Sequence, residues 1–409
     1  MLRFLTAGES HGQALVAILE GIPAGLALDA AALQHELRRR QQGYGRGRRM
    51  AIESDRAQIL SGLRHGVTTG APIALLIPNK DWENWQRTMA VEAPPAPETP
   101  GIDRPSVTRP RPGHADLAGV AKYGGDDIRN ILERASARET AARVALGAIA
   151  RQLLQAIDAT IVSHVVSIGP VSIPDPLAVT FDQVRAISSE SPIHCVMPVI
   201  EADMMRAIDT AREAGDTVGG SFEVIAHAVP PGLGSHVQWD RRLDGRLAQA
   251  LMSIQAIKAV GLGRGPDVAR LPGSRIHDEI LVAAPGGPGR DEPPTPLGVK
   301  RPTNNAGGLE GGMTNGEDVR VMGYMKPIAT LMKPLRSVDL TTMEESQAAI
   351  ERSDVCAVPA AAVVGEAMVA IVLAQAALEK FGGDSLDEFV TNYRAYRSRL
   401  SARFKGAPA

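Results

Sequence analysis

The chain of 409 residues has only two cysteines, Cys195 and Cys356. Two cysteines are too few for a disulfide scaffold or for a cysteine-based zinc site, so we expect both to be buried, reduced thiols. The formal net charge is also small, -2 at neutral pH, which argues against a protein that holds nucleic acid by bulk electrostatics. A local basic patch could still bind a polyanion, so the distribution of charge matters more than its total.

Several signatures of nucleotide and hydrolase chemistry are missing from the sequence. It contains no G-x-x-x-x-G-K-[ST] motif, and its GYGRG and GLGRG stretches do not fit a strand-turn-helix G-x-G-x-x-G. No cluster of His and Cys has zinc-ligand spacing, and no G-x-S-x-G elbow marks a hydrolase. We therefore expect neither a P-loop nor a Rossmann phosphate site, and no bound metal.

The N-terminal segment MLRFLTAGESHG has no long apolar core, so no secretory signal is visible and we predict the cytoplasm as the compartment. One run, residues 355–378, is long and apolar enough to be considered as a membrane span. Pro359, Glu366 and Gln375 interrupt this run, and small residues dominate it. Because charge inside a membrane is costly, we predict a buried core helix and no membrane partner.

The remaining pattern is that of a mixed α/β chain. Asp29 precedes a helical pattern over residues 30–42 that ends in Arg38, Arg39 and Arg40. The spacings Ser136-x-x-Glu139 and Ser385-x-x-Glu388 predict capping boxes before two further helices. Strand-like runs occupy residues 57–63, 71–78, 159–169 and 220–229, and helical runs occupy residues 201–215 and 242–260.

Residues 81–112 are rich in proline and lack periodicity, which predicts a long ordered excursion over the surface. The chain shows no repeat of 20 to 50 residues and no flexible linker that separates two parts. We therefore predict one domain over residues 1–409, of the α/β class in its layered, α+β form.

Arginine is concentrated between residues 38 and 49, at Arg38, Arg39, Arg40, Arg46, Arg48 and Arg49. The planar guanidinium fork suits phosphate and carboxylate, and the intervening glycines let backbone amides approach the same anion. A solvated basic surface is the alternative interpretation. Further arginines near a histidine or a helix start favour a site for a small polyanion; they are Arg104, Arg109, Arg111, Arg129 and Arg134.

Two of the nine histidines lie in glycine-flanked turns beside polar or basic residues: His11 in GESHG and His114 in RPRPGHAD. A histidine in such a place can give or take a proton near neutral pH, although a lone histidine is more often structural. Asp354 precedes the apolar run and is either a helix N-cap or a carboxylate in a partly dry site. His35, His164 and His227 are poorer candidates, because they lie within a helix and two strand-like runs.

Taken together, nine blocks in one order resemble the chorismate synthase family in its bacterial form. The blocks are TAGESHG, RRRQQGYGRGRRM, ILSGLRHGVTTGAPIA, RPRPGHAD, ERASARETAARVA, SIQAIKAVG, NNAGGLEGGMTNG, MKPIAT and RSDVCAVPA. The resemblance covers about residues 1–383 and leaves residues 384–409 as a terminal helix and tail. It implies a single-domain β-α-β sandwich and a homotetramer.

The resemblance also implies a reaction. It is the anti-1,4-elimination of phosphate from 5-enolpyruvylshikimate-3-phosphate, which gives chorismate in the last step of the shikimate pathway for aromatic amino acid biosynthesis. The family requires reduced FMN although the reaction has no net redox change. NADPH is a possible reductant of that flavin, and a separate flavin reductase is a possible partner.

Site residues follow from the resemblance position by position. His11 and His114 match the family's proton donors toward the reduced flavin and the departing phosphate, and Asp354 matches a carboxylate that relays a proton with the flavin. The positions that match flavin-binding residues are Arg134, Ala135, Ser136, Gln255, Ala256, Gly311, Lys326, Pro327, Ile328, Ala329, Thr330 and Arg352. Arg40 and Arg46 match positions that bind NADP or the substrate, and we group Ser10, Arg49, Arg111 and Arg129 with them.

Two other functions fit parts of the pattern. A basic-loop module that binds RNA or another polyanion should carry stacking aromatics near its arginines, and Tyr44 is the only aromatic residue there. An NADPH-flavin oxidoreductase should consume NADPH in proportion to turnover. We expect no nucleic-acid partner.

Overall fold

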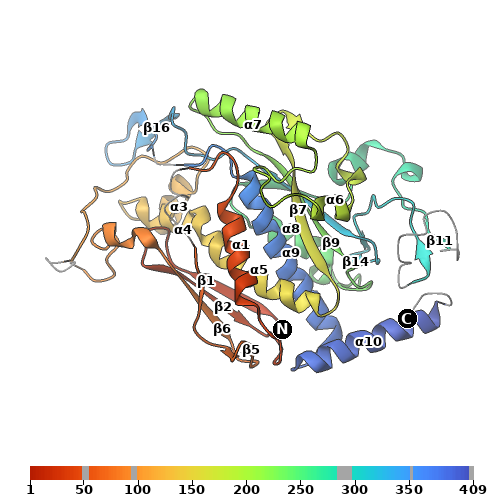
Figure 1. Cartoon of the computed structure of the whole chain (residues 1–409). Coiled ribbons are helices and arrows are strands. Elements are labelled where there is room, and N and C mark those ends of the chain that lie inside the picture. Colours follow the sequence, from red (N-terminus) through yellow and green to blue (C-terminus); the bar gives the residue numbers. More distant parts are fainter. Residues whose placement is uncertain (48–54, 94–98, 283–296, 351–352, 405–409) are drawn as a thin grey trace.

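The computed structural model describes residues 1–47, 55–93, 99–282, 297–350 and 353–404. Two antiparallel sheets lie on either side of a layer of long helices (Figure 1). The first sheet has the order β1 (Arg3–Ala7), β2 (Ala14–Glu20), β6 (Ile73–Pro78), β3 (Gln58–Ile59). The second has the order β10 (Ile257–Leu262), β15 (Val319–Met325), β9 (Gly220–His227), β7 (Thr160–Ile168), β8 (Val171–Ser172).

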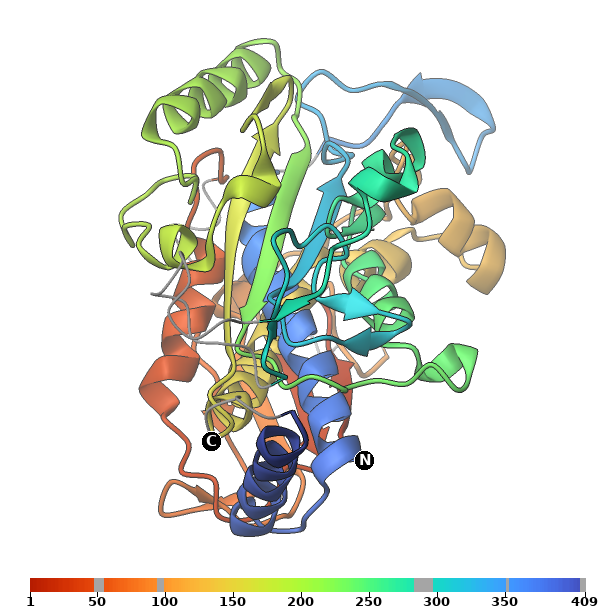
Figure 2. The same cartoon turned by 90° about the vertical axis from the view of Figure 1, so that its right-hand side faces the viewer.

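Two helices fill the space between the sheets. α5 (Thr140–Gln155) packs on β2 and β6, and α9 (Val358–Phe381) packs on β7 and β9, while the two helices pack on each other. α1 (Ala30–Gln41) lies against both, and α8 (Leu243–Met252) covers α9 beside β10 (Figure 2). The layers are sheet, helices, sheet, so the structure confirms the β-α-β sandwich.

Helix α9 is the apolar run that is long enough for a membrane span and that we predicted to be a buried core helix. By length and hydropathy it could cross a membrane, but most of its residues are buried inside the molecule. Its one ionised residue at mid-length, Glu366, is fully buried and accepts hydrogen bonds from Arg39 (2.7 Å), Arg151 and Ser163 (2.6 Å). Burial alone would raise the pKa of Glu366, but the two guanidinium groups outweigh it and hold that pKa far below its ordinary value. The prediction of a core helix is confirmed.

The contact between α5 and α9 depends on a missing side chain at Gly147. A Cβ atom there would lie 2.3 Å from Cβ and 2.5 Å from Cα of Ala367. We expect Gly147→Ala to lower the free energy of unfolding by about 1–3 kcal/mol, because overpacking forces the helices apart. Gly245→Ala on α8 is the matched control, since no neighbouring atom lies within 4 Å. It should stabilise by up to about 1 kcal/mol through helix propensity. Denaturant unfolding compares the two variants, and equal unfolding free energies would contradict this account of the packing.

Most predicted elements are confirmed. Asp29 caps α1 by accepting from the backbone N–H groups of Ala31 and Ala32, and the three arginines form its last turn. The four strand-like runs contain β3, β6, β7 and β9, and the helical run at residues 201–215 lies in α7 (Pro198–Glu213). The capping box of Ser385 and Glu388 is formed at the start of α10 (Leu386–Arg403). Cys195 and Cys356 are free and buried, and burial raises the pKa of Cys356 to about 11.

Two local predictions are wrong. The helical run at residues 242–260 stops at Met252, because the chain turns at Ala256, with φ of 67°, and Ile257 and Val260 then pair with β15 as strand β10. At Ser136 the hydroxyl does cap, accepting from the Arg138 N–H at 3.3 Å, but no capping box forms. The Glu139 carboxylate is drawn instead to Thr6 and Arg143, so the segment opens as a 3₁₀ helix, η2 (Ala137–Glu139).

The remaining elements cover the edges of the sandwich. Within the described part of residues 81–112, a short 3₁₀ helix, η1 (Lys80–Asn84), is followed by irregular backbone, as expected for a surface excursion. The smaller helices are α3 (Asp116–Tyr123), α4 (Arg129–Ala135) and α6 (Phe181–Arg185). The two-stranded sheets are β4 (Leu63–Arg64) with β5 (Val67–Thr68), β11 (Leu281–Val282) with β12 (Val299–Lys300), β13 (Leu309–Glu310) with β14 (Met313–Thr314), and β16 (Arg336–Asp339) with β17 (Glu344–Gln347).

Candidate active site

A cavity of 410 Å³ opens where the C-terminal end of α1, the start of α5 and the N-terminal end of α9 meet. Loops after β1, before α3, before β10 and after β15 complete its wall. The fold thus collects residues from positions 10 to 364 around one space. Among the predicted site residues, those that line it are Ser10, His11, Arg40, Arg46, Arg111, His114, Ala135, Ser136, Gln255, Ala256, Lys326, Ile328, Ala329, Thr330 and Asp354.

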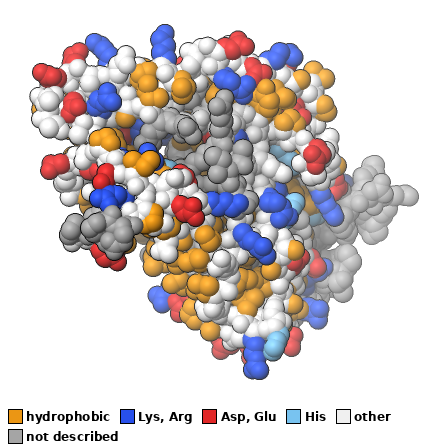
Figure 3. All heavy atoms as spheres, turned by 60° about the vertical axis from the view of Figure 1, so that its left-hand side comes forward, with side chains coloured by type: hydrophobic (Ala, Val, Ile, Leu, Met, Phe, Trp, Pro, Cys, Tyr) orange, Lys and Arg blue, Asp and Glu red, His pale blue; other side chains and the backbone are white. Residues whose placement is uncertain are grey.

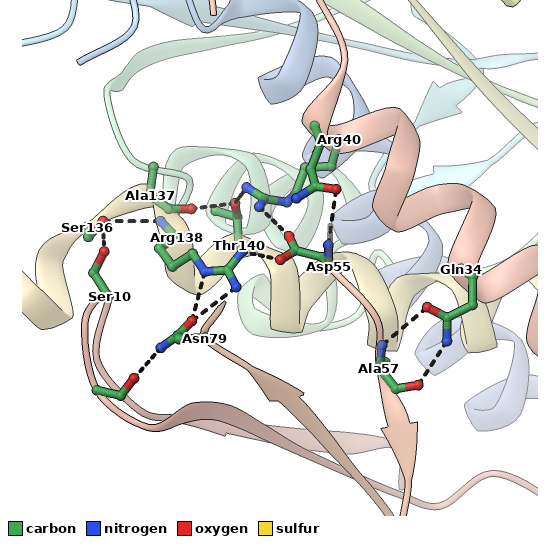
Figure 4. Close-up of polar contacts among 12 residues, drawn as sticks. Ser10, Gln34, Arg40, Asp55, Ala57, Asn79, Ser136, Ala137, Arg138 and Thr140 are labelled. Carbon is green, nitrogen blue, oxygen red and sulfur yellow. Dashed lines mark hydrogen bonds and ion pairs between the residues drawn. The ribbon is translucent and has the colours of Figure 1, made fainter. Parts of the chain in front are cut away.

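Two arginines on one wall share a single carboxylate, as Figure 4 shows. Arg40, which is only 3% exposed, donates to Asp55 at 2.8 Å and to Thr140 Oγ1 at 3.3 Å. Arg138 donates to the other oxygen of Asp55, and also to Asn79 Oδ1 at 3.0 and 3.1 Å. One carboxylate between two guanidinium groups leaves an excess of one positive charge, which faces the cavity.

The charge of the whole lining has the same sign. Arg40, Arg46, Arg111, Arg138 and Lys326 line the cavity, and Asp354 is the one carboxylate that does so within the described residues. Burial and the nearby Lys258 lower the pKa of Lys326, whose ammonium donates to the Gly113 carbonyl. A concave, partly dry surface with this balance concentrates anions. The prediction of a site for a small polyanion therefore has a physical location.

His114 is held by a buried carboxylate. Its Nδ1 donates to Asp116 Oδ1, and Asp116 also accepts from the backbone N–H (3.0 Å) and Nε (2.9 Å) of Arg111. Burial alone would raise the pKa of Asp116, but these hydrogen bonds outweigh it and hold the pKa well below its ordinary value. Arg111 reaches on to Thr330 Oγ1 at 3.2 Å. The ring therefore has a fixed orientation in which Nε2 is the atom left for a ligand.

His11 lies in the turn between β1 and β2 and has a similar partner. Its backbone N–H donates to Glu133 at 2.8 Å, and its Nδ1 lies 2.9 Å from both oxygens of the same carboxylate. The ring stacks on Trp85 with centroids 3.9 Å apart and planes 21° apart. Beside it, Ser136 Oγ donates to Ser10 Oγ at 3.2 Å. The turn and the start of η2 together place a histidine and two hydroxyl groups on the cavity wall.

Asp354 is not a helix N-cap, because α9 begins at Val358 and its N-cap position is Ala357. The carboxylate instead accepts from Arg46 at 2.8 Å and from the backbone N–H of Gly47 at 2.6 Å. Its side chain keeps 21% of its surface exposed. Of the two predicted alternatives, the carboxylate in a partly dry site is the one that the structure supports.

Several predicted binding residues do not line the cavity. The Arg134 guanidinium donates to the carbonyls of Thr6 (2.8 Å) and Gly8 (2.9 Å), which fixes the loop that carries His11. Arg129 donates to the Pro105 carbonyl at 3.1 Å, and Pro327 is flanked by lining residues. Gly311 lies in the turn between β13 and β14, with φ of 59°. Arg49 and Arg352 lie outside the described residues.

Two of the buried wall atoms that lack a hydrogen-bond partner among the described residues suit a ligand. They are Oε1 of Gln255, an acceptor, and Nε of Arg40, a donor. A buried polar group without a partner is costly, so each is an atom that a ligand could satisfy. A planar heterocycle with ring N–H groups would match the acceptor, and an acid group would match the donor. The wall therefore fits a flavin and an anionic substrate, which sequence reasoning had taken from resemblance alone.

Sequence reasoning missed four residues that form this geometry. Asp55, Asp116, Glu133 and Trp85 orient the cationic and imidazole side chains without having been candidates. Asp116 could have been found from its place two residues after His114, inside the same motif. The other three meet their partners only through tertiary contacts. Arg138, two residues after Ser136, lines the cavity and was likewise not among the candidate site residues.

Comparisons with known proteins agree over nearly the whole chain. A family model described as chorismate synthase matches residues 2–378. A chorismate synthase from Desulforudis audaxviator is 56% identical over 99% of this chain and 100% of its own length. One from Moorella thermoacetica is 57% identical over 98% of this chain and 99% of its own. A crystal structure of a chorismate synthase, 43% identical, covers 98% of both chains with a TM-score of 0.76. The chain belongs to the chorismate synthase family.

Proposed function

We propose that the chain converts 5-enolpyruvylshikimate-3-phosphate to chorismate by 1,4-elimination of phosphate, with reduced FMN and substrate bound together in the cavity. Membership of the family makes the chain an enzyme, a carbon-oxygen lyase that acts on a phosphate ester. The single observation that carries the proposal is the cavity itself. It combines an excess of cationic side chains with two carboxylate-held histidines.

The substrate class matches the charge of the wall. The substrate carries a phosphate and two carboxylates, and the arginine pair around Asp55 offers planar, multidentate contacts of the kind these groups prefer. Asp55 and Asn79 hold the two guanidinium groups in place before a ligand arrives. Preorganised cations are worth most where charge develops during the reaction, here on the departing phosphate.

Proton transfer falls to the histidines. We assign His114 to the departing phosphate, since Asp116 holds its Nδ1 side and Nε2 stays available. We assign His11 to the flavin and Asp354 to a proton relay with it, as the family resemblance implies. Each of these groups lines the cavity, so each is placed where a ligand could meet it.

The residues present fit reduced FMN. Gln255 offers an unpartnered buried acceptor, Lys326 a cation, and Ala135, Ala256 and Ala329 a wall without bulky side chains. When bound, reduced FMN would supply transient electron donation that weakens the allylic bond to phosphate. Ala256 has φ of 67°, a backbone strain of the kind that collects at functional sites. Gly311, Arg352, NADPH and a separate flavin reductase stay predictions from the resemblance.

Assembly and compartment are part of the proposal. The outer face of the first sheet exposes Leu5 (67%), Ile18 (39%) and Leu60 (60%). Figure 3 shows a patch of hydrophobic side chains in the lower half of one face, with charged side chains around it. Large exposed apolar areas mark contact surfaces, so we propose that copies of the chain cover this one in a homotetramer. We propose the cytoplasm as the compartment.

The test is an anaerobic assay of the purified chain with the phosphorylated substrate. With reduced FMN we expect release of inorganic phosphate and formation of chorismate, and with oxidised FMN neither. Consumption of NADPH in step with product would instead favour an oxidoreductase. Binding of RNA that falls steeply with salt, with no phosphate release, would favour the polyanion-binding module.

A further inference from the structure

The imidazole of His11 is constrained from two directions by residues that do not line the cavity. Neither Glu133 nor Trp85 is part of the cavity wall. Both nevertheless contact His11, Glu133 through hydrogen bonds and Trp85 through ring stacking. Both residues can therefore act on a bound ligand through His11.

Glu133 sets the direction of the ring within its own plane. Its side chain is only 1% exposed, and its carboxylate takes both the backbone N–H and the Nδ1 side of His11. The Ser10 N–H also donates to the Glu133 backbone carbonyl at 3.0 Å, so this residue binds the loop at three points. With Nδ1 occupied, Nε2 is the ring nitrogen that remains for the cavity.

Trp85 sets the tilt of the ring, which a hydrogen bond at Nδ1 leaves free. An imidazole can rotate about the line joining Nδ1 to its acceptor unless one of its faces is covered. The indole covers one face of the imidazole, with ring centroids 3.9 Å apart and planes 21° apart.

The indole is itself fixed. Its Nε1–H donates to Asp81 at 2.9 Å, and the Arg104 guanidinium carbon lies 4.1 Å from the ring centroid. The side chain is nearly buried, at 9% exposed.

We propose that Trp85 and Glu133 are positioning residues that together hold His11 in the orientation its proton transfer requires. The inference rests on the proposed role of His11. It adds that this role depends on Glu133 in α4 and on Trp85 in the segment after β6. That segment is tied to the same loop at Asn79, whose Nδ2 donates to the carbonyls of Glu9 (3.1 Å) and Gly12 (2.6 Å). The proline-rich segment at residues 81–112 thus contributes Trp85 from outside the cavity, in addition to Arg111 on its wall.

The test compares Trp85→Leu and Trp85→Phe with Trp82→Leu as a matched control. Trp82 lies in η1, of which Trp85 is the C-cap, and in the described part of the chain the ring that stacks on His11 is that of Trp85, not that of Trp82. We expect Trp85→Leu to lower kcat about tenfold, because misplacement of a reacting group by less than 1 Å is enough for losses of that size. KM for the substrate and the affinity for FMN should change by less than about threefold, since Trp85 touches neither in the cavity.

The conservative variants separate positioning from a merely structural role. Trp85→Phe keeps a ring face and should restore kcat to within about threefold of wild type. Glu133→Gln keeps the size and an acceptor but removes the charge, and we expect a loss of kcat like that of Trp85→Leu. If Trp85→Leu does not fold, Trp85→Phe and Glu133→Gln still test the proposal.

A second readout needs no activity. In the NMR spectrum of the ligand-free protein, the ring protons of His11, assigned by their loss in His11→Gln, should be shifted upfield by the indole. The shift should vanish in Trp85→Leu and persist in Trp82→Leu. An unshifted His11 signal in wild type, or wild-type kcat in Trp85→Leu, would overturn the proposal. Absence of lyase activity in wild type would overturn the proposed function alone, because the NMR result would still stand.

Discussion

Replacing His114 by alanine is expected to lower kcat by about 10²- to 10⁴-fold, the range typical of a lost general acid. The departing phosphate would then carry its full charge without a proton from Nε2. Folding should survive the change, because Asp116 keeps its hydrogen bonds from the backbone N–H and Nε of Arg111. The affinity for FMN should change by less than about threefold, since a group that acts only in the transition state contributes little to ground-state binding.

The control for this variant is His35→Ala, which removes an exposed histidine on α1. Steady-state kinetics under anaerobic conditions gives kcat, and quenching of flavin fluorescence gives the affinity for oxidised FMN. If His114→Ala and His35→Ala had the same kcat, His114 would not be the acid. If His114→Ala lost flavin affinity and kcat to the same extent, the histidine would be a binding residue.

Arg40→Met is expected to lower kcat/KM about 100-fold, the second largest effect. A hydrogen bond to a charged group is worth about 1.5–3 kcal/mol, and the partly dry cavity favours the upper part of that range. Burial lowers the pKa of Arg40, although the nearby Asp55 carboxylate acts in the opposite direction. The Nε atom of Arg40 has no hydrogen-bond partner among the described residues. Methionine keeps much of the apolar stem, and Asp55 keeps Arg138, so the loss should appear in catalysis before it appears in folding.

Arg38→Met is the matched control for Arg40→Met. Arg38 lies two residues earlier in the last turn of α1, but its side chain is exposed, whereas Arg40 is buried. We expect the Arg38 variant to keep kcat/KM within about twofold, since exposed charges contribute little. Equal losses in both variants would mean that the arginines at the C-terminal end of α1 act only through their long-range electrostatic field. No loss in either would remove the arginine pair from the substrate site.

Local sequence signals predicted the elements whose ends are decided locally. Asp29 fixed the start of α1, and a long apolar run with few charges was enough to identify α9. The same reasoning failed where a distant partner competes for a group. Glu139 accepts hydrogen bonds from Thr6 and Arg143 and does not close the predicted capping box. Residues 257–260 were predicted to be helical, but they pair with β15 as a strand. In both cases a tertiary contact outweighed a local preference worth about 1 kcal/mol.

The residues of the site also fall into those that the sequence indicated and those that only the tertiary structure brings to the site. Residue chemistry alone led to an arginine-lined anion site with two candidate acids, and the structure places Arg40, Arg46, His11 and His114 around one cavity. The β-α-β sandwich, the flavin and the reaction came from resemblance. Glu133 and Trp85 could not be anticipated, because their contacts with His11 span 122 and 74 positions along the chain and follow no short motif.

The most direct test of the central claim is the ratio of chorismate formed to electrons consumed in an anaerobic, multiple-turnover experiment. The purified chain is mixed with one equivalent of reduced FMN and an excess of the phosphorylated substrate, with no other reductant present. Elimination without net redox change predicts many chorismates and equal amounts of phosphate per flavin, with the flavin still reduced at the end. One chorismate per flavin with oxidised FMN as the end product, or the same yield when oxidised FMN is supplied, would contradict the claim.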